Sequence, residues 1–227
     1  MRAFFGGEEP GFFVEVGANH PIEGSQTFHL EQAGWTGVLV EPQPELAAFL
    51  VTSRKAQVFA VACTSPDKAG QSLPLHVDGP RSALDHSRMA AGAQAAYTIV
   101  VPTRTLDSVL EEAKAPVPIE LLSIDVEGHE VEVLQGLDLD RWQPMLILVE
   151  DHVSNLKTHH YLQSQGYRLV RRLGFNGWYV PASEPVRSTA AERWEILRKY
   201  YLALPFRMLR NAGRKVRRLY ADWWAGR

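Results

Sequence analysis

The sequence has one cysteine and no apolar run that approaches the length of a membrane span. The single thiol, Cys63, excludes an intramolecular disulfide framework and a cysteine-rich zinc site, so nothing demands an oxidising compartment. Near the N-terminus, two glycines and two glutamates at residues 6–9 interrupt the phenylalanines before the apolar core of a signal peptide can form. These absences predict a cytoplasmic protein.

Charge divides the chain into two unequal parts. Residues 186–227 hold 11 of the 24 Lys and Arg residues and 3 of the 26 acidic residues, so this part carries about +8 and the rest about −10. At 227 residues and 45% apolar composition, the chain is long enough for one sizeable core. We therefore predict one domain over residues 1–185 and a basic amphipathic helical tail over residues 186–227.

The first part of the domain has the pattern of a strand-helix-strand unit. The apolar run 12–16 reads as a buried parallel strand, and Gly17 after it would allow a tight turn. Ser25 is the predicted N-cap of a helix that runs through Leu30 and stops before Gly34. A second apolar run, at 37–40, leads to Glu41-Pro42.

Glu41 indicates what the unit binds. It follows Gly17 by 24 positions, where Rossmann-like folds hold a ribose diol with an acidic residue at the end of the second strand. The turn lacks the pattern G-x-G-x-x-G, because the next glycine after Gly17 is Gly24, so a close approach of a pyrophosphate is not supported. S-adenosylmethionine fits, since it has a ribose, an adenine and a charged methionine end but no phosphate.

The rest of the domain alternates strands and helices, which predicts an α/β fold. The helix over 44–53 should turn Leu46, Phe49 and Leu50 toward the core. The other predicted elements are helices over 105–114, 130–135 and 156–165, strands over 57–63, 119–124 and 145–149, and a final hairpin of strands 167–172 and 178–180.

Residues 65–94 have the least regular sequence, with several Pro and Gly breakers. A long irregular insertion in a compact domain is either a solvated loop or a functional lid. In the second case Arg81 and Ser82 are the expected contacts with the substrate.

Four carboxylates end four predicted strands. In open α/β sheets ligands bind outside the carboxyl ends of the strands, and the side chains at this edge are Glu15, Glu41, Asp125 and Glu150. Gathered there, they repel one another without a cation or a donor-rich ligand, so we predict a functional role for the set.

Five stretches, in this order, resemble the FkbM family of S-adenosylmethionine-dependent methyltransferases: Val14-Glu15-Val16-Gly17-Ala18-Asn19, Gly34-Trp35-Thr36-Gly37-Val38-Leu39-Val40-Glu41-Pro42, Thr105-Leu106-Asp107-Ser108-Val109-Leu110, Ile124-Asp125-Val126-Glu127-Gly128-His129-Glu130 with Leu134-Gln135-Gly136, and Ile147-Leu148-Val149-Glu150. The resemblance covers roughly residues 12–181. After the Asn the family usually has a small or acidic residue and then glycine, whereas this chain has His20-Pro21.

The resemblance implies a class I fold, a Rossmann-like sheet of seven mostly parallel strands that ends in an antiparallel hairpin. It also implies that the loop at 62–64 lies beside the adenine. The residues expected to bind S-adenosylmethionine are Glu15, Gly17, Ala18, Asn19, Ser25, Glu41, Pro42, Ala62, Cys63 and Asp125.

Transfer of a methyl group to a hydroxyl requires a group that holds the acceptor oxygen in line and removes its proton. His129 and His152 are the predicted bases, because the histidine pKa lies near working pH, and Asp125 and Glu127 are further catalytic candidates. Alternatively, Asp125, Glu150 and His152 could bind Mg²⁺, although the spacing does not require a metal.

The tail interleaves aromatic and aliphatic residues with arginines, and Pro205 should divide it into two helices. This composition suits a helix that lies in the interface of an anionic membrane. The protein would then be a peripheral protein at the inner face of the membrane. Packing on the domain or on a second subunit, as in a homo-oligomer, fits equally. Nucleic acid is disfavoured because the acidic body would repel a phosphate backbone.

The sequence thus predicts an S-adenosylmethionine-dependent O-methyltransferase. The resemblance suggests that its acceptor is a sugar hydroxyl of a glycan or lipid-linked saccharide. The alternatives are O-methylation of a soluble secondary metabolite and a non-catalytic nucleotide-binding or membrane-scaffold protein.

Overall fold

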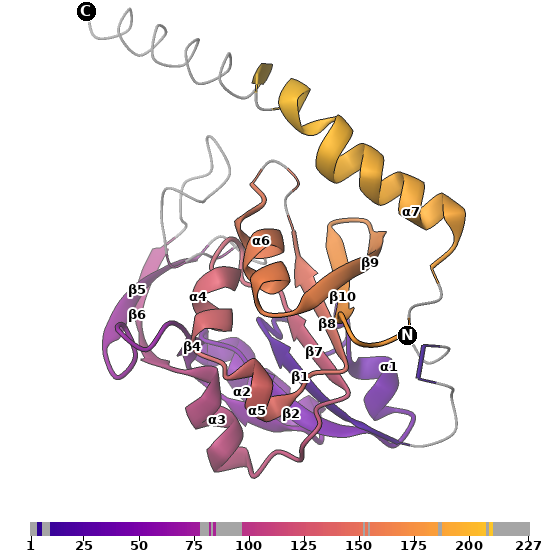
Figure 1. The fold of residues 1–227 in the computed structure, drawn as a ribbon. Helices are drawn as coiled ribbons and strands as arrows, with labels where there is room; N and C mark the ends of the chain where they lie inside the picture. Colours follow the sequence, from indigo (N-terminus) through magenta and orange to yellow (C-terminus); the bar gives the residue numbers. More distant parts are fainter. Residues whose placement is uncertain are drawn as a thin grey trace, which may run out of the picture.

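The centre of the protein is a seven-stranded sheet with the strand order β3-β2-β1-β7-β8-β10-β9 (Figure 1). Its strands are β1 (Phe12–Val16), β2 (Thr36–Val40), β3 (Gln57–Phe59), β7 (Leu121–Ile124), β8 (Leu146–Glu150), β9 (Tyr167–Leu173) and β10 (Asn176–Pro181). The first five strands in this order, β3, β2, β1, β7 and β8, pair in parallel, and β10 lies antiparallel between β8 and β9. This confirms the predicted α/β fold, with its mostly parallel sheet and terminal hairpin.

The computed structural model describes residues 4–5, 10–77, 82, 84, 97–151, 153, 155–185, 188–207 and 209–210. Two of the predicted site residues, Arg81 and His152, lie outside this part of the chain, as does the tail beyond residue 210.

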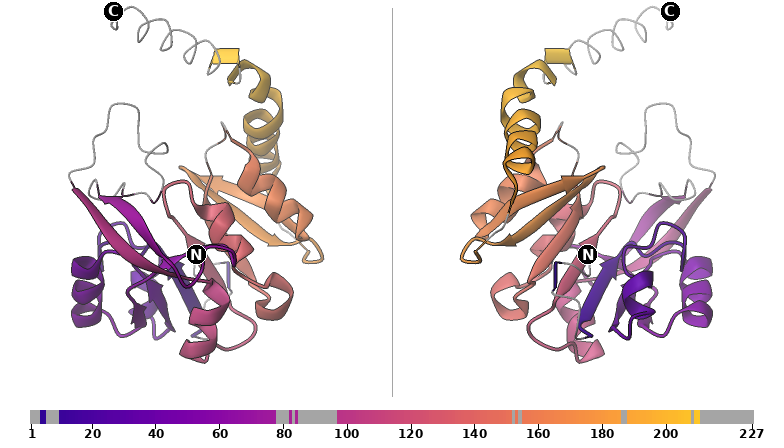
Figure 2. Two further views of the ribbon diagram at one scale, coloured as in Figure 1. Left: turned by 90° about the vertical axis from the view of Figure 1, so that its left-hand side faces the viewer. Right: turned by 90° about the vertical axis from the view of Figure 1, so that its right-hand side faces the viewer.

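Helices cover both faces of the sheet (Figures 1 and 2). Because successive residues of a strand point to opposite faces, Phe13 packs with α1 and α2 while Val14 packs with helices α3 to α6. Both residues are fully buried, as expected for a sheet covered on both sides. The helices are α1 (Phe28–Glu31), α2 (Pro44–Ser53), α3 (Leu106–Ala113), α4 (Glu130–Gln135), α5 (Leu139–Trp142) and α6 (Lys157–Ser164).

A second, three-stranded sheet corrects the prediction for residues 57–94. The expected strand 57–63 is divided in two, β3 in the main sheet and β4 (Ala62–Cys63) in the second sheet. Strand β5 (Ser72–Val77) lies inside the insertion predicted to be irregular, and pairs with β6 (Tyr97–Arg104). Pro74 suggested that no regular strand forms here, but β5 lies at the edge of its sheet, where proline is tolerated.

Two local predictions about helices were wrong. Helix α1 begins at Phe28, so its N-cap is Thr27 and not Ser25, although the Ser25 oxygen accepts the N–H of Phe28 while its hydroxyl donates to Glu15. On α2 the buried residues include Leu50, but Phe49 is exposed and packs edge-on against the His20 ring. The prediction for α3 is confirmed, with Thr105 as N-cap and an apolar face that is fully buried.

The first part of the tail lies against the domain. Helix α7 (Ala190–Ile196) and the π-helix η2 (Leu197–Leu202) continue one another, and α7 packs against β9. In η2, Tyr200 is fully buried. Within the described residues, no helix combines the length and apolarity needed to cross a membrane. The domain boundary at residue 185 stays a prediction.

Gly17 joins the ends of β1, β2 and β7. Its φ is +83°, and its N–H donates to the carbonyl of Val40 at the end of β2. A Cβ at this position would lie 1.9 Å from the carbonyl oxygen of Asp125, which follows β7. The absence of a side chain at Gly17 therefore lets the turn after β1 approach the end of β7.

We expect Gly17→Ala to lower the free energy of unfolding by about 3 kcal/mol or more, because a left-handed φ and a backbone clash act together. Chemical denaturation measures this change. The matched control is Gly70→Ala, where φ is +75° but no atom lies within 4 Å of the added Cβ, and the expected loss is about 1–2 kcal/mol. Equal losses in the two variants would contradict the role of close approach at Gly17.

Candidate active site

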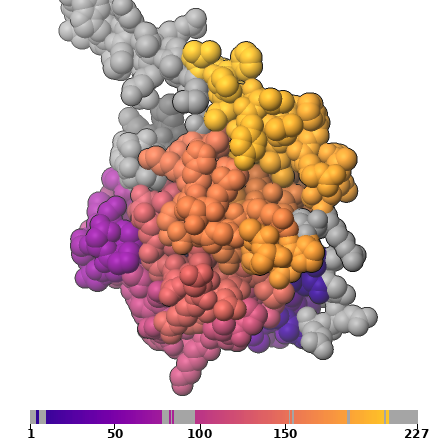
Figure 3. Space-filling view, viewed as in Figure 1, coloured from indigo at the N-terminus to yellow at the C-terminus, as the bar shows by residue number. Residues whose placement is uncertain are grey.

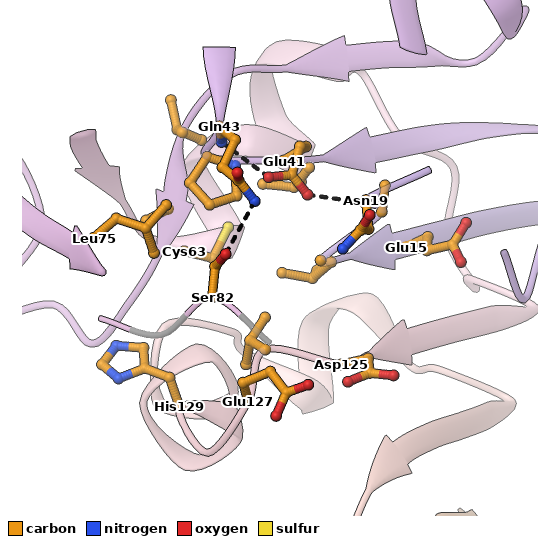
Figure 4. A pocket seen from close by; sticks show the side chains of 18 of the residues that line it. Glu15, Asn19, Glu41, Gln43, Cys63, Leu75, Ser82, Asp125, Glu127 and His129 are labelled. Atoms are coloured by element: carbon orange, nitrogen blue, oxygen red, sulfur yellow. Dashed lines mark hydrogen bonds between the residues drawn. The ribbon is translucent and has the colours of Figure 1, made fainter. Parts of the chain in front are cut away.

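A cavity of about 590 Å³ opens at the carboxyl ends of the central parallel strands (Figure 4). Its size is typical of a small-molecule site. The turns after β1, β2 and β7 contribute to its wall, together with β4 and residues near β5. In the sheet, β2 and β7 lie on opposite sides of β1, so the cavity lies at the point where the strand order reverses.

Of the residues predicted to bind the cofactor, all but one line this cavity: Glu15, Gly17, Ala18, Asn19, Glu41, Pro42, Ala62, Cys63 and Asp125. Ser25 is the one that does not. The predicted catalytic residues Glu127 and His129 and the predicted substrate contact Ser82 also line it.

Glu41 is held by the backbone of the two turns beside it. Its two carboxylate oxygens accept N–H groups from Asn19 and Gln43, at 2.8 and 2.9 Å. Burial raises its pKa, while these two hydrogen bonds partly oppose that rise. Each oxygen keeps a further lone pair, so the carboxylate can accept hydrogen bonds from a ligand hydroxyl without losing its position.

The Glu15 side chain binds the loop after β1 and does not point into the centre of the cavity (Figure 4). Its carboxylate accepts hydrogen bonds from the Ser25 hydroxyl, the Gln26 N–H and the Thr27 hydroxyl, at 3.0, 2.7 and 2.5 Å. Figure 4 shows it turned away from Cys63 and Ser82. Burial raises its pKa, against the effect of these bonds and of nearby Arg54.

Arg54, which sequence reasoning did not single out, connects this loop to the body of the domain. Its side chain is buried and donates to the Thr27 hydroxyl and to the Pro21 carbonyl, both at 3.0 Å. It also pairs with buried Glu31 at 3.2 Å. Its position one residue after α2 gave no sign of a role, because the partners lie more than 20 residues away.

The His20-Pro21 turn, at which the chain departs from the family pattern, has its own cap. The His20 Nδ1 atom accepts N–H groups from Ile22 and Glu23, at 3.2 and 2.9 Å. His20 and Glu23 both line the cavity. The departure therefore leaves an ordered wall here.

Cys63 and His129 lie on the wall formed by β4 and the start of α4. Burial raises the pKa of the Cys63 thiol to about 12, which disfavours a nucleophilic thiolate. The His129 ring is buried, and its Nε2 atom lies 3.0 Å from the Thr64 hydroxyl. These contacts place both residues on a packed surface of the cavity.

Three carboxylates gather at the ends of β7 and β8. Oxygen atoms of Asp125, Glu127 and Glu150 all lie within 4.8 Å of one another. Burial, followed by the charges of Asp125, Glu127 and Glu130, raises the pKa of Glu150 to about 8. Such a group can bind a proton or a hard divalent cation such as Mg²⁺.

Ser82 lies beside the turn that follows β2. The Gln43 amide donates to its hydroxyl at 3.4 Å, and Leu84 lines the same region. Gln43 was not predicted from the sequence, although its position directly after Glu41-Pro42 could have indicated it.

The lining of the cavity is acidic. Glu15, Glu23, Glu41, Asp125 and Glu127 contribute carboxylates, and among the described lining residues there is no Lys or Arg. This charge disfavours a phosphate-bearing ligand and favours one with a positive charge.

A family model described as the methyltransferase FkbM domain matches residues 15–169, from the end of β1 into β9. No curated protein matches the sequence. The matched segment is well over half of the chain and includes Gly17, Glu41 and the Asp125–Glu150 carboxylates around the cavity. The chain belongs to the FkbM family of methyltransferase domains.

Proposed function

We propose that this methyltransferase binds S-adenosylmethionine in the cavity and transfers the methyl group to a hydroxyl oxygen. The observation that carries the proposal is Glu41, a buried carboxylate that ends β2 and lines the cavity beside the Gly17 turn. An acidic residue at this place in a Rossmann-like fold suits a ribose diol. The acidic lining suits a sulfonium and an ammonium group.

The wall residues support one orientation of the cofactor. Glu41 would accept the ribose hydroxyls, and Ala62 with Cys63 would pack against the adenine on the side of β4. Asp125 and the turn after β1 would hold the methionine end. When bound, S-adenosylmethionine would supply an electrophilic methyl group.

The carboxylates at the ends of β7 and β8 are suited to the proton of the acceptor. A hydroxyl oxygen that forms a bond to the methyl carbon must lose its proton, while the bond from carbon to sulfur breaks. Asp125 and Glu127 face the cavity and can orient the hydroxyl, and the group they form with Glu150 can take up its proton. Of the two bases predicted from the sequence, His129 lines the cavity with its ring held by Thr64, and His152 lies outside the described residues.

A sugar hydroxyl of a glycan or lipid-linked saccharide is the acceptor we propose. Neighbouring hydroxyls on one ring match several acidic acceptors on one wall, as Asp125 and Glu127 provide. Mg²⁺ held by the three carboxylates would serve the same acceptor by binding its oxygens. The step described above uses only groups of the protein.

Titration calorimetry with S-adenosylhomocysteine tests the cofactor. We expect micromolar binding, and about tenfold or more weaker binding by Glu41→Gln, because glutamine leaves one of the N–H groups of Asn19 and Gln43 without an acceptor and removes the charge. The matched control is Glu120→Gln. Glu120 also accepts a backbone N–H, from Phe12 at 2.8 Å, but does not line the cavity.

Two outcomes would refute this assignment. One is binding of ATP or NADH in preference to S-adenosylhomocysteine, and the other is equal weakening in the Glu41 and Glu120 variants. If selective binding is found, a screen with methyl-labelled S-adenosylmethionine identifies the acceptor. Turnover of a soluble metabolite but of no glycan would replace the sugar, and binding without any turnover would support a non-catalytic protein.

The pKa of Glu150 predicts a pH dependence of stability. Because its folded-state pKa of about 8 lies above the model-peptide value of 4.5, the folded protein holds an extra proton between these limits. This stabilisation is complete below the lower value and is lost as pH rises through the higher one. The melting temperature of the wild type in EDTA should therefore fall more between about pH 6 and about pH 9 than that of Glu150→Gln.

The control for this experiment is Glu45→Gln, a substitution at an exposed position of α2, which should keep the slope of the wild type. The same slope in all three proteins would contradict the proposed sharing of a proton. A rise in melting temperature on adding Mg²⁺ at the higher pH, present in the wild type and absent in Glu150→Gln, would show that the carboxylates bind the cation.

A further inference from the structure

The helical segment 190–210 exposes an apolar surface. Along it the exposed residues recur in pairs four positions apart, from 193–194 to 209–210, and so lie on one side, which we call the outer face. Figure 3 shows this segment on the surface beside the terminal hairpin. Its large apolar side chains and their exposed fractions are Trp194 58%, Leu197 43%, Leu202 51%, Phe206 74% and Leu209 72%. Tyr201 is 48% exposed, but its hydroxyl lies 3.2 Å from the Nε2 atom of buried His159 in α6, so it also contacts the domain.

The side of the segment that faces the domain carries charged residues beside apolar ones such as Ile196 and Leu204. Glu192 pairs with Arg171 of β9 at 2.6 Å, and Glu195 pairs with Lys199 along the helix at 2.5 Å. A surface helix normally buries its apolar stripe and exposes its charges. Here large apolar side chains are exposed on the outer face, so packing on the domain does not account for them.

Tyr200 fixes this orientation. Its hydroxyl donates to the carboxylate of Asp151 at 2.7 Å and accepts from the Arg172 guanidinium at 2.6 Å. The same Asp151 oxygen also accepts from the Tyr179 hydroxyl at 2.9 Å, and all four side chains are buried. Rotation of the segment to bury its apolar face would remove Tyr200 from this network, and Asp151 and Arg172 would each lose one buried hydrogen bond.

The outer face combines its apolar residues with positive charge. Arg193, Arg198 and Arg210 lie on it, and the sequence continues with a cluster of four basic residues at 214–218. Aromatic and aliphatic side chains interleaved with arginine are typical of helices in the membrane interface. We propose that the outer face docks on an anionic lipid surface.

Charge favours this occupant over a second copy of the chain. A symmetric dimer through the outer face would bring the same arginines together, in a part of the chain with a net charge of about +8. An anionic bilayer neutralises these charges and accepts the apolar side chains in the same contact.

The hydrogen bonds of Tyr200 also connect the segment to the active site. Asp151 directly follows Glu150, one of the three carboxylates at the strand ends. Docking would therefore hold the carboxylate edge near a surface that can present a lipid-linked acceptor. This consequence rests on the proposed function, whereas the docking itself does not.

Flotation of the full chain with vesicles tests the proposal. We expect binding to phosphatidylcholine vesicles that contain phosphatidylglycerol, weak binding to phosphatidylcholine alone, and loss of binding at high salt. The double substitution Phe206→Ser and Leu209→Ser should lower the partition coefficient about tenfold or more, because both residues are largely exposed and available to lipid. The matched control is Val100→Ser with Val117→Ser, which removes two exposed residues elsewhere and should bind as the wild type does.

Three results would overturn the proposal: no binding to either vesicle, equal loss in the test and control variants, and a dimer in ultracentrifugation that the test variant makes monomeric. Unchanged affinity of the test variant for S-adenosylhomocysteine verifies that its fold is intact. Because vesicle binding and cofactor binding are measured separately, failure of the docking proposal and failure of the proposed function remain distinguishable.

Discussion

The buried network of Glu15, Arg54 and Glu31, in which Arg54 pairs with Glu31 and shares Ser25 and Thr27 with Glu15, is the constraint on which the cavity depends. Glu15 and Arg54 together hold Ser25 and Thr27, and Arg54 alone holds the Pro21 carbonyl. Two carboxylates and one guanidinium without access to water are stable only when each is hydrogen-bonded. The network therefore orders the loop that forms one wall of the cavity, including its His20-Pro21 turn.

The carboxylates at the sheet edge thus have different roles although they end equivalent strands. Glu15 is directed to the loop, while Glu41 is fixed between two backbone N–H groups. Asp125 and Glu127 face the cavity and form a group with Glu150 in which one proton is favoured at neutral pH. Their separation into a structural acid, a held acceptor and a proton-sharing group gives the cavity both a fixed shape and a negative potential.

Local patterns predicted most of the fold, because buried parallel strands and capped helices have strong signals along the sequence. The position of the site was predictable from the expected topology, because the carboxyl ends of parallel strands meet at one edge and bring Glu41 and Asp125 to the same cavity. Contacts between distant residues could not be read in this way, so Arg54 and its partners were missed. The strand β5 was also missed, since its edge position, which tolerates Pro74, depends on pairing with residues 20 or more positions away.

The terminal segment shows why amphipathic periodicity alone does not tell which face a helix buries. Its apolar residues recur at helical spacing, and this pattern fits a stripe packed on the domain as well as one on a membrane. Tyr200 decides which face is buried, because its hydroxyl is hydrogen-bonded to buried Asp151 and Arg172. The buried hydrogen bonds of Tyr200 fix the segment without using its apolar surface. This surface therefore remains available to the lipid bilayer that we propose as its partner.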